Sequence, residues 1–326
     1  MSIQPIQLRE EQALTLYRQP SLIPGLESVR DEWSVIEFTT LADYRTLLFA
    51  QENGIKIKYL PEFRVFTPVK GGEFSEMIRF KLMGPIAREI GKLVPAESEA
   101  SSLWRNSAKT VDGLILHSRE AAPILKGIAS ASAKEGGGRV EFGPGDQHIT
   151  KDPVSLARKV QQKSLKADEP PERAVRRIGD AVRGTIIFES PKKMRQAIHK
   201  FQDLLARKGM KVVFDNKWIV SRKDGYTGVH AKLLLKTPKG ADVIGEIQFH
   251  LSDLCDGTSG SPKETAHRLY ERIRSSPGPQ EEATAASNFM YTAAIGHATV
   301  MGTRSQEAQA VLQGRVKGLI ETKASG

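Results

Sequence analysis

Two acidic residues in the second half of the chain stand at predicted strands, and together they could hold a divalent metal ion. Asp180 comes just before the β-branched run 183–189, and Glu246 lies within the run 243–250. Magnesium prefers hard oxygen ligands and usually takes only one or two carboxylates from a protein, leaving its other positions to phosphate and water. If the two strands are neighbours, Asp180 and Glu246 meet that need, and we predict that both bind Mg2+.

The strand that carries Glu246 is predicted to have one polar face. Side chains alternate along a strand, so Glu246, Gln248 and His250 project to one side, and Ile247 and Phe249 to the other. An acid, an amide and an imidazole in a row could serve a reaction. A solvent-exposed sheet face has the same pattern, so this strand alone does not decide between the two.

A row of cations is predicted on a helix near residue 151. Lys151, Ser155 and Lys159 follow at intervals of four, which places them on one helix face, and Arg158 flanks them. Such a stripe could hold the triphosphate of a donor nucleotide and neutralise its charge during transfer. A solvated basic face is the alternative, and the stripe by itself leaves it open.

A glycine loop further along the chain presents an aromatic ring. Gly225 permits a turn from which Tyr226 can project, and a tyrosine stacked on a base contributes about 1–3 kcal/mol. Arg222 and Lys223 precede the loop and could bind phosphate, and His230 begins the next strand. An ordinary basic turn with a packing tyrosine has the same pattern.

Three more residues are candidates with less support. Arg183, next to Gly184, is either a phosphate ligand or a charge at a strand edge. His267 and Tyr270, three apart on a predicted helix, could lean towards the acids or simply pack. Core packing is the expectation for Tyr270, and the role of His267 stays open.

The elements around these residues predict an α+β domain. The expected helices are 153–163, 170–178, 191–208 and 262–274, and the expected strands are 183–189, 211–214, 218–220, 229–236 and 243–250. A hairpin turn is predicted at Asp215 and Asn216. Helices packed on one side of a mostly antiparallel sheet are typical of this class.

The remainder of the chain suggests further regions. The run 132–150 has the Gly and Pro density of a linker or long loop. We therefore expect residues 1–135 to form a mixed α/β or mainly helical region with a docking, delivery or regulatory role. The catalytic domain is expected at 140–275, and a helical tail packing on it at 280–326. Strands are expected within 33–50 and 55–69, helices at 74–94 and 111–133, and a break in the tail near Gly302.

The bulk composition restricts partners and location. The 326 residues carry a net charge of +10, which favours an anionic partner such as nucleotide, nucleic acid or headgroups. The single cysteine, Cys255, excludes a disulfide within the chain and argues against a cysteine-based zinc site. Because the start lacks a secretory pattern and no apolar run could span a bilayer, we expect a cytoplasmic protein without a membrane partner. Export by a route that reads no such signal stays open.

Five segments, in this order, resemble the synthetase domain of the RelA/SpoT-type alarmone synthetases. They are KDPVSLARK at 151–159, DAVRGTIIF at 180–188, RKDGYTGVH at 222–230, GEIQFH at 245–250 and AHRLYE at 266–271. The lysine–serine–arginine–lysine spacing, the Gly-Tyr-x-x-x-His loop, the Glu-Ile-Gln strand and the Ala-His-x-x-Tyr helix are similar to the family's motifs. The resemblance is to the small members that have only the synthetase activity.

The resemblance implies a nucleotidyltransferase-like fold and the transfer of pyrophosphate from ATP to the 3′-hydroxyl of GDP or GTP. On that reading Asp180 binds magnesium, and Glu246 binds magnesium or accepts the hydroxyl proton. The residues implied to bind ATP are Lys151, Ser155, Arg158, Lys159 and Arg183. The residues implied to contact the acceptor are Arg222, Lys223, Tyr226, His230, Gln248 and His267.

Departures from the family pattern leave the acceptor open. Arg183 precedes Gly184, whereas the common family form has the glycine first, and no proline follows the basic residues before Gly225. An adenosine nucleotide (ADP or ATP) or the 3′ end of tRNA is therefore an alternative acceptor, and the protein could be a growth-inhibiting toxin or effector. A non-catalytic nucleotide- or RNA-binding module of the same fold is the other alternative. The oligomeric state is open.

Overall fold

The computed structural model of the chain falls into two compact units. One unit comprises residues 86–221 and 227–252, and the other comprises 1–85, 222–226 and 253–326. The structure describes residues 46, 49, 50, 55, 57–60, 63, 65–69, 86–90, 104–142, 149–218, 223–255, 261–275 and 279–301. Most of the strands and helices expected at 33–50 and 74–94 lie outside these residues, as does the tail beyond 301.

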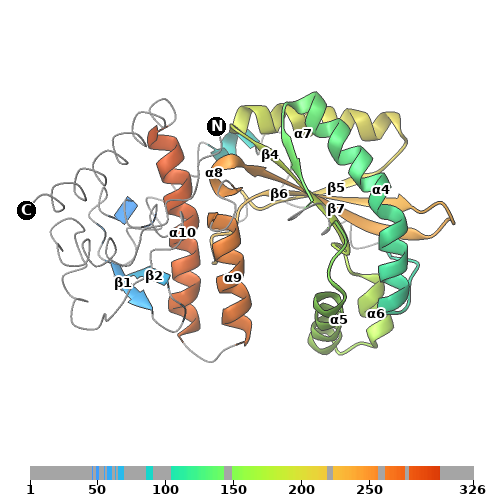
Figure 1. The fold of residues 1–326 in the computed structure, drawn as a ribbon, viewed down its shortest axis with the longest axis horizontal. Helices are drawn as coiled ribbons and strands as arrows, with labels where there is room; N and C mark the ends of the chain where they lie inside the picture. The colour runs from blue at the N-terminus through green and yellow to red at the C-terminus, as the bar shows by residue number, and fades with distance from the viewer. Residues whose placement is uncertain are drawn as a thin grey trace, which may run out of the picture. The chain divides into compact units, whose positions relative to one another are not determined.

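A five-stranded sheet forms the centre of the first unit (Figure 1). Its strands, in spatial order, are β3 (Arg139–Glu141), β4 (Val182–Phe188), β7 (Asp242–Leu251), β6 (Val229–Lys236) and β5 (Val212–Asn216). Only the β4–β7 pair is parallel, and the other three pairs are antiparallel. The predicted α+β class with a mixed, mostly antiparallel sheet is confirmed.

Two helices cover one face of this sheet, α4 (Val111–Gly136) and α7 (Pro191–Arg207). In α7, Ser190 caps the helix by accepting from the Lys193 N–H, and the buried residues recur every three or four positions. Phe201 from α7 packs edge-on against Phe249 of β7, with ring centroids 5.3 Å apart. This face is the apolar one, and it forms the core of the unit.

A smaller pair of helices stands at one end of the sheet, α5 (Pro153–Ala167) and α6 (Pro171–Arg176). Asp152 caps α5 by accepting from the Ser155 N–H, and Pro153 occupies the first turn as predicted. An apolar cluster packs the two helices together and includes Leu114, Leu156, Val160, Ala174, Val175 and Ile178. The cluster fixes α5 beside the segment that leads into β4.

The predicted hairpin turn at Asp215 and Asn216 is wrong. Both residues lie in β5, where they pair with His230 and Val229 of β6. The Asn216 side chain accepts from the Trp218 N–H, so the chain turns one or two residues later than expected. Asp and Asn are typical turn residues, but here both extend β5, which stands last in the strand order of the sheet.

The linker expected over 132–150 is also wrong in its first part. Helix α4 continues to Gly136, Gly137 ends it in the left-handed conformation with φ of 67°, and β3 then pairs with β4. A Cβ atom on Gly138 would come within 2.6 Å of the Phe188 ring. The glycines thus serve a helix cap and a close approach, and α4 belongs to the same unit as the sheet. The roles assigned to residues 1–135, 140–275 and 280–326 stay predictions.

The second unit contains a short hairpin and two long helices. Strands β1 (Ile57–Leu60) and β2 (Val65–Pro68) are antiparallel, as expected within 55–69. Helix α9 (Pro262–Ser275) packs beside α10 (Gln280–Met301), and α8 (Ser252–Cys255) is a single turn after β7. In the part of the chain that the structure describes, no helix is long and apolar enough to cross a membrane.

Candidate active site

The face of the sheet away from α4 and α7 carries polar side chains. Residues that pair directly across neighbouring strands point to the same face. Glu246 of β7 pairs with Arg183 of β4 on one side and with Lys232 of β6 on the other, and Gln248 pairs with His230. We call this set the polar face, and its members are Arg183, Thr185, Asp215, His230, Lys232, Glu246, Gln248 and His250.

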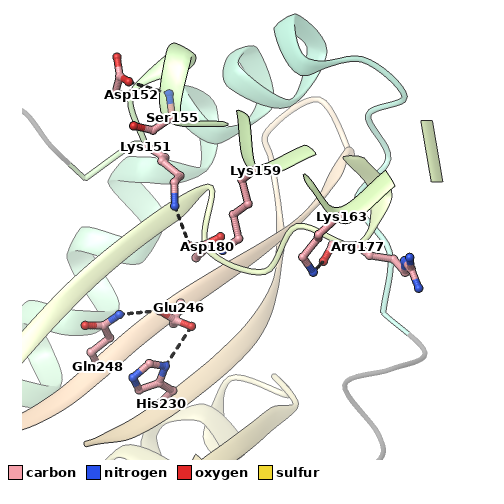
Figure 2. A network of polar contacts seen from close by, with 10 residues as sticks. All are labelled: Lys151, Asp152, Ser155, Lys159, Lys163, Arg177, Asp180, His230, Glu246 and Gln248. Carbon is pink, nitrogen blue, oxygen red and sulfur yellow. Dashed lines mark hydrogen bonds and ion pairs between the residues drawn. The ribbon is translucent and has the colours of Figure 1, made fainter. Parts of the chain in front are cut away.

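Asp180 lies just before β4 and is held by two lysines (Figure 2). The Nζ atoms of Lys151 and Lys159 lie 3.0 and 2.6 Å from the same oxygen, Oδ2. Lys159 stands on α5, as predicted, and reaches Asp180 from there, but Lys151 does not stand on that helix. Its backbone N–H donates to the carbonyl of Ala181 at 2.8 Å, so Lys151 lies alongside the start of β4. The prediction that Lys151 belongs to a row of cations on the helix is therefore wrong, although Lys151 and Lys159 both contact Asp180.

These contacts set the charge of the Asp180 carboxyl. Burial alone would raise the pKa of Asp180, but the charges and hydrogen bonds of Lys159 and Lys151 outweigh burial and hold it well below its usual range. Burial in turn lowers the pKa of the Lys151 ammonium, a shift that the charge of Asp180 opposes and that of Lys159 strengthens. The three groups form one buried ionic cluster.

Glu246 is held by a chain of polar contacts along the polar face (Figure 2). Its Oε2 lies 3.2 Å from Nδ1 of His230, and its Oε1 accepts from the Gln248 amide at 2.7 Å. The Nε2 atom of His250 lies 3.4 Å from Oε1 of Gln248. The prediction that Glu246, Gln248 and His250 share a face is confirmed, and His230 joins them from β6.

The surroundings of Glu246 keep it ionised. Burial would raise its pKa, but the charge and hydrogen bond of His230, with a hydrogen bond from Gln248, lower the pKa to about 2. The charge of Asp180 acts in the opposite sense. This mutual repulsion follows from the parallel pairing of Val182 with Gly245, which brings the residues just before β4 near the middle of β7.

The two carboxylates fit a magnesium ion. The Oδ1 atom of Asp180 is buried and, in the described part of the chain, has no hydrogen-bond partner. Within the same residues, no cluster of three or more His, Cys, Asp or Glu side chains could hold a metal by itself. An ion at Asp180 and Glu246 would therefore take its remaining ligands from substrate phosphate and water, which is the way Mg2+ commonly binds.

The other residues predicted to bind ATP lie around the same cluster. Ser155 is half-buried in the first turn of α5, and its backbone N–H donates to Asp152. Arg158 is exposed on the next turn. Arg183 lies on the polar face, and its charge contributes to lowering the pKa of Lys151.

The predicted acceptor residues divide between the two units. His230 and Gln248 belong to the polar face, whereas Lys223, Tyr226 and His267 belong to the second unit, and Arg222 lies outside the described residues. The roles of all six as acceptor ligands stay predictions.

The glycine loop has the expected turn. Gly225 has φ of 77°, which confirms that a glycine is required there. The half-buried ring of Tyr226 makes an edge-to-face contact with Tyr291, with centroids 5.9 Å apart. The expectation of core packing for Tyr270 is wrong, because its side chain is 38% exposed and its ring stacks on His267.

Three further residues near the carboxylates were not predicted. Lys163 and Lys232 carry charges beside Asp180, and buried Asn106 ties the segment before it to β7. The spacing of four from Lys159 could have indicated Lys163, and the alternation after His230 could have indicated Lys232. No sequence signal marks Asn106.

Comparison with known proteins gives likenesses among solved structures alone. No family model and no curated protein sequence matches the chain. The small alarmone synthetase 1 of Bacillus subtilis, solved with its product pppGpp, is 19% identical, with 62% of this chain and 93% of that chain covered and a TM-score of 0.37. A GTP pyrophosphokinase family protein of Streptococcus pneumoniae is 13% identical, with coverages of 64% and 94% and a TM-score of 0.37.

A Streptococcus mutans protein is similar at 16% identity, with 64% of this chain and 98% of that chain covered and a TM-score of 0.37. The first two proteins carry the names of the family that the sequence motifs resemble. Both identity and superposition are low, so the function proposed below rests on the geometry of the site.

Proposed function

We propose that this protein is a nucleotide pyrophosphokinase, which transfers pyrophosphate from ATP to the 3′-hydroxyl of a purine nucleotide. The observation that carries the proposal is the buried cluster at Asp180. One carboxylate oxygen is held by Lys151 and Lys159, the other has no partner among the described residues, and ionised Glu246 lies close by. Cations for phosphate beside two carboxylates for a metal are what phosphoryl transfer requires.

The reaction exchanges one phosphorus–oxygen bond for another. The acceptor 3′-oxygen bonds to the β-phosphorus of ATP, the bond from that phosphorus to the oxygen bridging the α-phosphate breaks, and AMP leaves with the bridging oxygen. The hydroxyl proton passes to the Glu246–His230 pair, whose Oε2 and Nδ1 atoms lie 3.2 Å apart. Because His230 and Gln248 both hold Glu246, the carboxylate keeps one orientation towards the acceptor.

Asp180 and Glu246 would hold Mg2+, which when bound supplies positive charge to the phosphate oxygens. Lys151 and Lys159 are the first ligands for the ATP phosphates. Both donate to Asp180, and an entering phosphate chain would give each of them a second anion to bind. Further ATP contacts are assigned to Ser155, Arg158 and Arg183.

The acceptor is proposed to be a guanosine or adenosine nucleotide. Tyr226 would stack on its purine, as aromatic side chains do in other nucleotide sites. The other acceptor contacts are assigned to Arg222, Lys223, His230, Gln248 and His267. The alternative acceptor is the 3′ end of tRNA, which the positive net charge of the chain would also attract.

A labelling experiment tests the activity and its acceptor together. The protein is incubated with Mg2+ and ATP labelled in the γ-phosphate, together with GDP, GTP, ADP, unlabelled ATP or tRNA in separate reactions. Label on one nucleotide identifies that acceptor, and label on tRNA favours the alternative. Absence of transfer to every acceptor contradicts the proposal and favours a non-catalytic binding module.

The proposed role as a growth-inhibiting toxin or effector needs a test in cells. Expression of the wild-type protein in a bacterial host should arrest growth, and Glu246→Gln should relieve the arrest at equal protein level. Equal arrest by both proteins would separate toxicity from the transfer reaction.

A further inference from the structure

Two lysines beside Asp180, Lys163 and Lys232, form no ion pair with an acidic side chain among the residues that the structure describes. Lys163 donates to the backbone oxygen of Arg177 at 3.3 Å, which is an uncharged acceptor. The side chain of Lys232 makes neither a hydrogen bond nor an ion pair with any other residue that the structure describes. Its direct neighbour across the sheet, Glu246, is bound instead by His230 and Gln248.

The fold brings these two lysines together from different elements. Lys163 stands on α5, one turn beyond Lys159, and Figure 2 shows its side chain next to that of Lys159. Lys232 comes from β6, and its Cε atom lies 3.6 Å from the place that a Cβ atom on Gly179 would occupy. Its side chain therefore passes over the chain segment that leads into Asp180.

The charges in this region do not balance. Six cations gather there, namely Lys151, Lys159, Lys163, Arg177, Arg183 and Lys232. Against them stand the carboxylates of Asp180 and Glu246, with that of Glu169 paired to Arg177. Burial first, and then the charges of Lys159, Arg177 and Lys232, lower the pKa of Lys163, while Asp180 raises it. Cations held together at this cost are typical of a site that binds an anion.

We propose that Lys163 and Lys232 form a second phosphate position, which binds the far end of a polyphosphate chain whose nearer phosphate lies at Lys151 and Lys159. One helix turn separates Lys159 from Lys163, roughly 6 Å along the axis, so a chain lying along α5 can contact both. The site would then select ligands by the number of linked phosphates. The inference deepens the proposed function, on which the placing of the nearer phosphate rests.

Binding of inorganic phosphates tests this position without any turnover. The probes are phosphate, pyrophosphate and tripolyphosphate, titrated by calorimetry into wild-type protein and into Lys163→Gln, Lys232→Gln and the double variant. A charge-assisted hydrogen bond contributes about 1.5–3 kcal/mol, so each substitution should weaken tripolyphosphate binding about tenfold or more. Phosphate binding should change by less than about threefold, since one phosphate fits at Lys151 and Lys159.

Lys166→Gln is the matched control, because Lys166 is exposed on the last turn of the same helix and its loss changes the net charge equally. Tripolyphosphate binding unchanged in the double variant would overturn the inference. An equal loss for all three probes, or an equal loss in Lys166→Gln, would also overturn it, because either result means a general charge effect. Titration with ATP and AMP shows whether the bound phosphate chain belongs to a nucleotide. The variants should bind ATP more weakly than the wild type and bind AMP with unchanged affinity.

Thermal unfolding separates a binding role from a structural one. Without ligand, Lys163→Gln and Lys232→Gln should each be at least as stable as the wild type, because each removes repulsion between cations. A lower unfolding temperature in either would overturn the inference. The proposed function can fail on its own. If the protein transfers no label but the variants lose their preference for longer phosphate chains, the second phosphate position is supported and the proposed function is not. An active enzyme with unchanged binding in the variants refutes the second position alone.

Discussion

The Nζ atom of Lys159 lies 2.6 Å from Oδ2 of Asp180, while Oδ1 of the same carboxylate is buried and has no hydrogen-bond partner among the described residues. Lys151 also donates to Oδ2, so the two lysines fix the orientation of the Asp180 carboxylate and leave Oδ1 available. A buried polar atom without a partner usually has a functional reason. Here the reason proposed is a metal ion shared with Glu246.

Removing the charge of Asp180 should destabilise the protein. In Asp180→Asn, Lys151 and Lys159 lose the anion that compensates their burial, and breaking a buried ion pair at one partner costs about 3 kcal/mol or more. We expect a lower free energy of unfolding in urea, partly restored by tripolyphosphate, and no pyrophosphate transfer. A variant as stable as the wild type would show that the lysines have other anions.

Glu246→Gln should lose activity while keeping the fold. The amide is of equal size and can still contact Gln248, but it can neither accept a proton nor supply a charge. General base catalysis contributes roughly 10²–10⁴-fold, so single-turnover rates should fall by that factor. Asp203→Asn is the control, because Asp203 is an exposed acid on α7, which covers the opposite face of the sheet. A loss of less than about threefold in Glu246→Gln would exclude a catalytic role.

The two depressed carboxylate pKa values predict a loss of stability in acid. In an unfolded chain the ordinary pKa is about 3.9 for an aspartate such as Asp180 and about 4.3 for a glutamate such as Glu246. In the folded chain the pKa of Glu246 is about 2, and that of Asp180 is lowered as well. The unfolded state therefore binds more protons below about pH 5, and the stabilisation, fully present above that pH, is lost as pH falls through the folded values. Urea unfolding from pH 6 down to pH 3 should show this slope, and Asp180→Asn and Glu246→Gln should each flatten it.

Asn106 should matter for the position of Asp180. Its buried amide donates to the carbonyls of Val175 and Ile178 at 3.0 and 2.8 Å, and its oxygen accepts from the Ile244 N–H at 2.8 Å. Asn106→Ala removes these three hydrogen bonds. The Val175 carbonyl still accepts from the Ile178 N–H at 3.2 Å, so the Ile178 carbonyl and the Ile244 N–H lose their partner, which should cost about 2–4 kcal/mol and reduce activity.

The neighbouring residue offers a control for that change. Ser107 accepts from the Asp242 N–H in an exposed contact at 2.8 Å, and Ser107→Ala should cost about 1 kcal/mol or less. Chemical denaturation measures both variants. Equal effects of the two substitutions would mean that Asn106 is not a special link between the Asp180 segment and β7.

Two glycines of α4 should respond in opposite directions to alanine. A Cβ atom on Gly136 would lie 2.4 Å from Cβ of Ala197 on α7, so Gly136→Ala should destabilise by about 1–3 kcal/mol. A Cβ atom on Gly127 meets nothing within 4 Å, and Gly127→Ala should stabilise by about 0.5–1 kcal/mol because alanine favours a helix interior. Thermal unfolding of both variants checks the packing of α4 on α7.

The local features of this site could be predicted from the amino-acid sequence. The alternation of β7 predicted the shared face of Glu246 and Gln248, because side chains along a strand must alternate. Pro153 marked the start of α5, because a proline suits the first turn of a helix. The place of Asp180 before a strand followed from the β-branched residues after it.

Which of these local features lie close together depends on the packing of strands and helices that are distant in the sequence. The parallel pairing of β4 with β7 brings Asp180 near Glu246, and strand partners depend on the burial of whole sheet faces, which no periodicity within one strand records. The same holds for Lys151, which reaches Asp180 from an extended segment outside α5. Lys232 lies near Lys163 because β6 pairs with β7 in the sheet. The alternation of side chains along β6 predicts which face Lys232 points to, but it does not predict which residue of another element lies there.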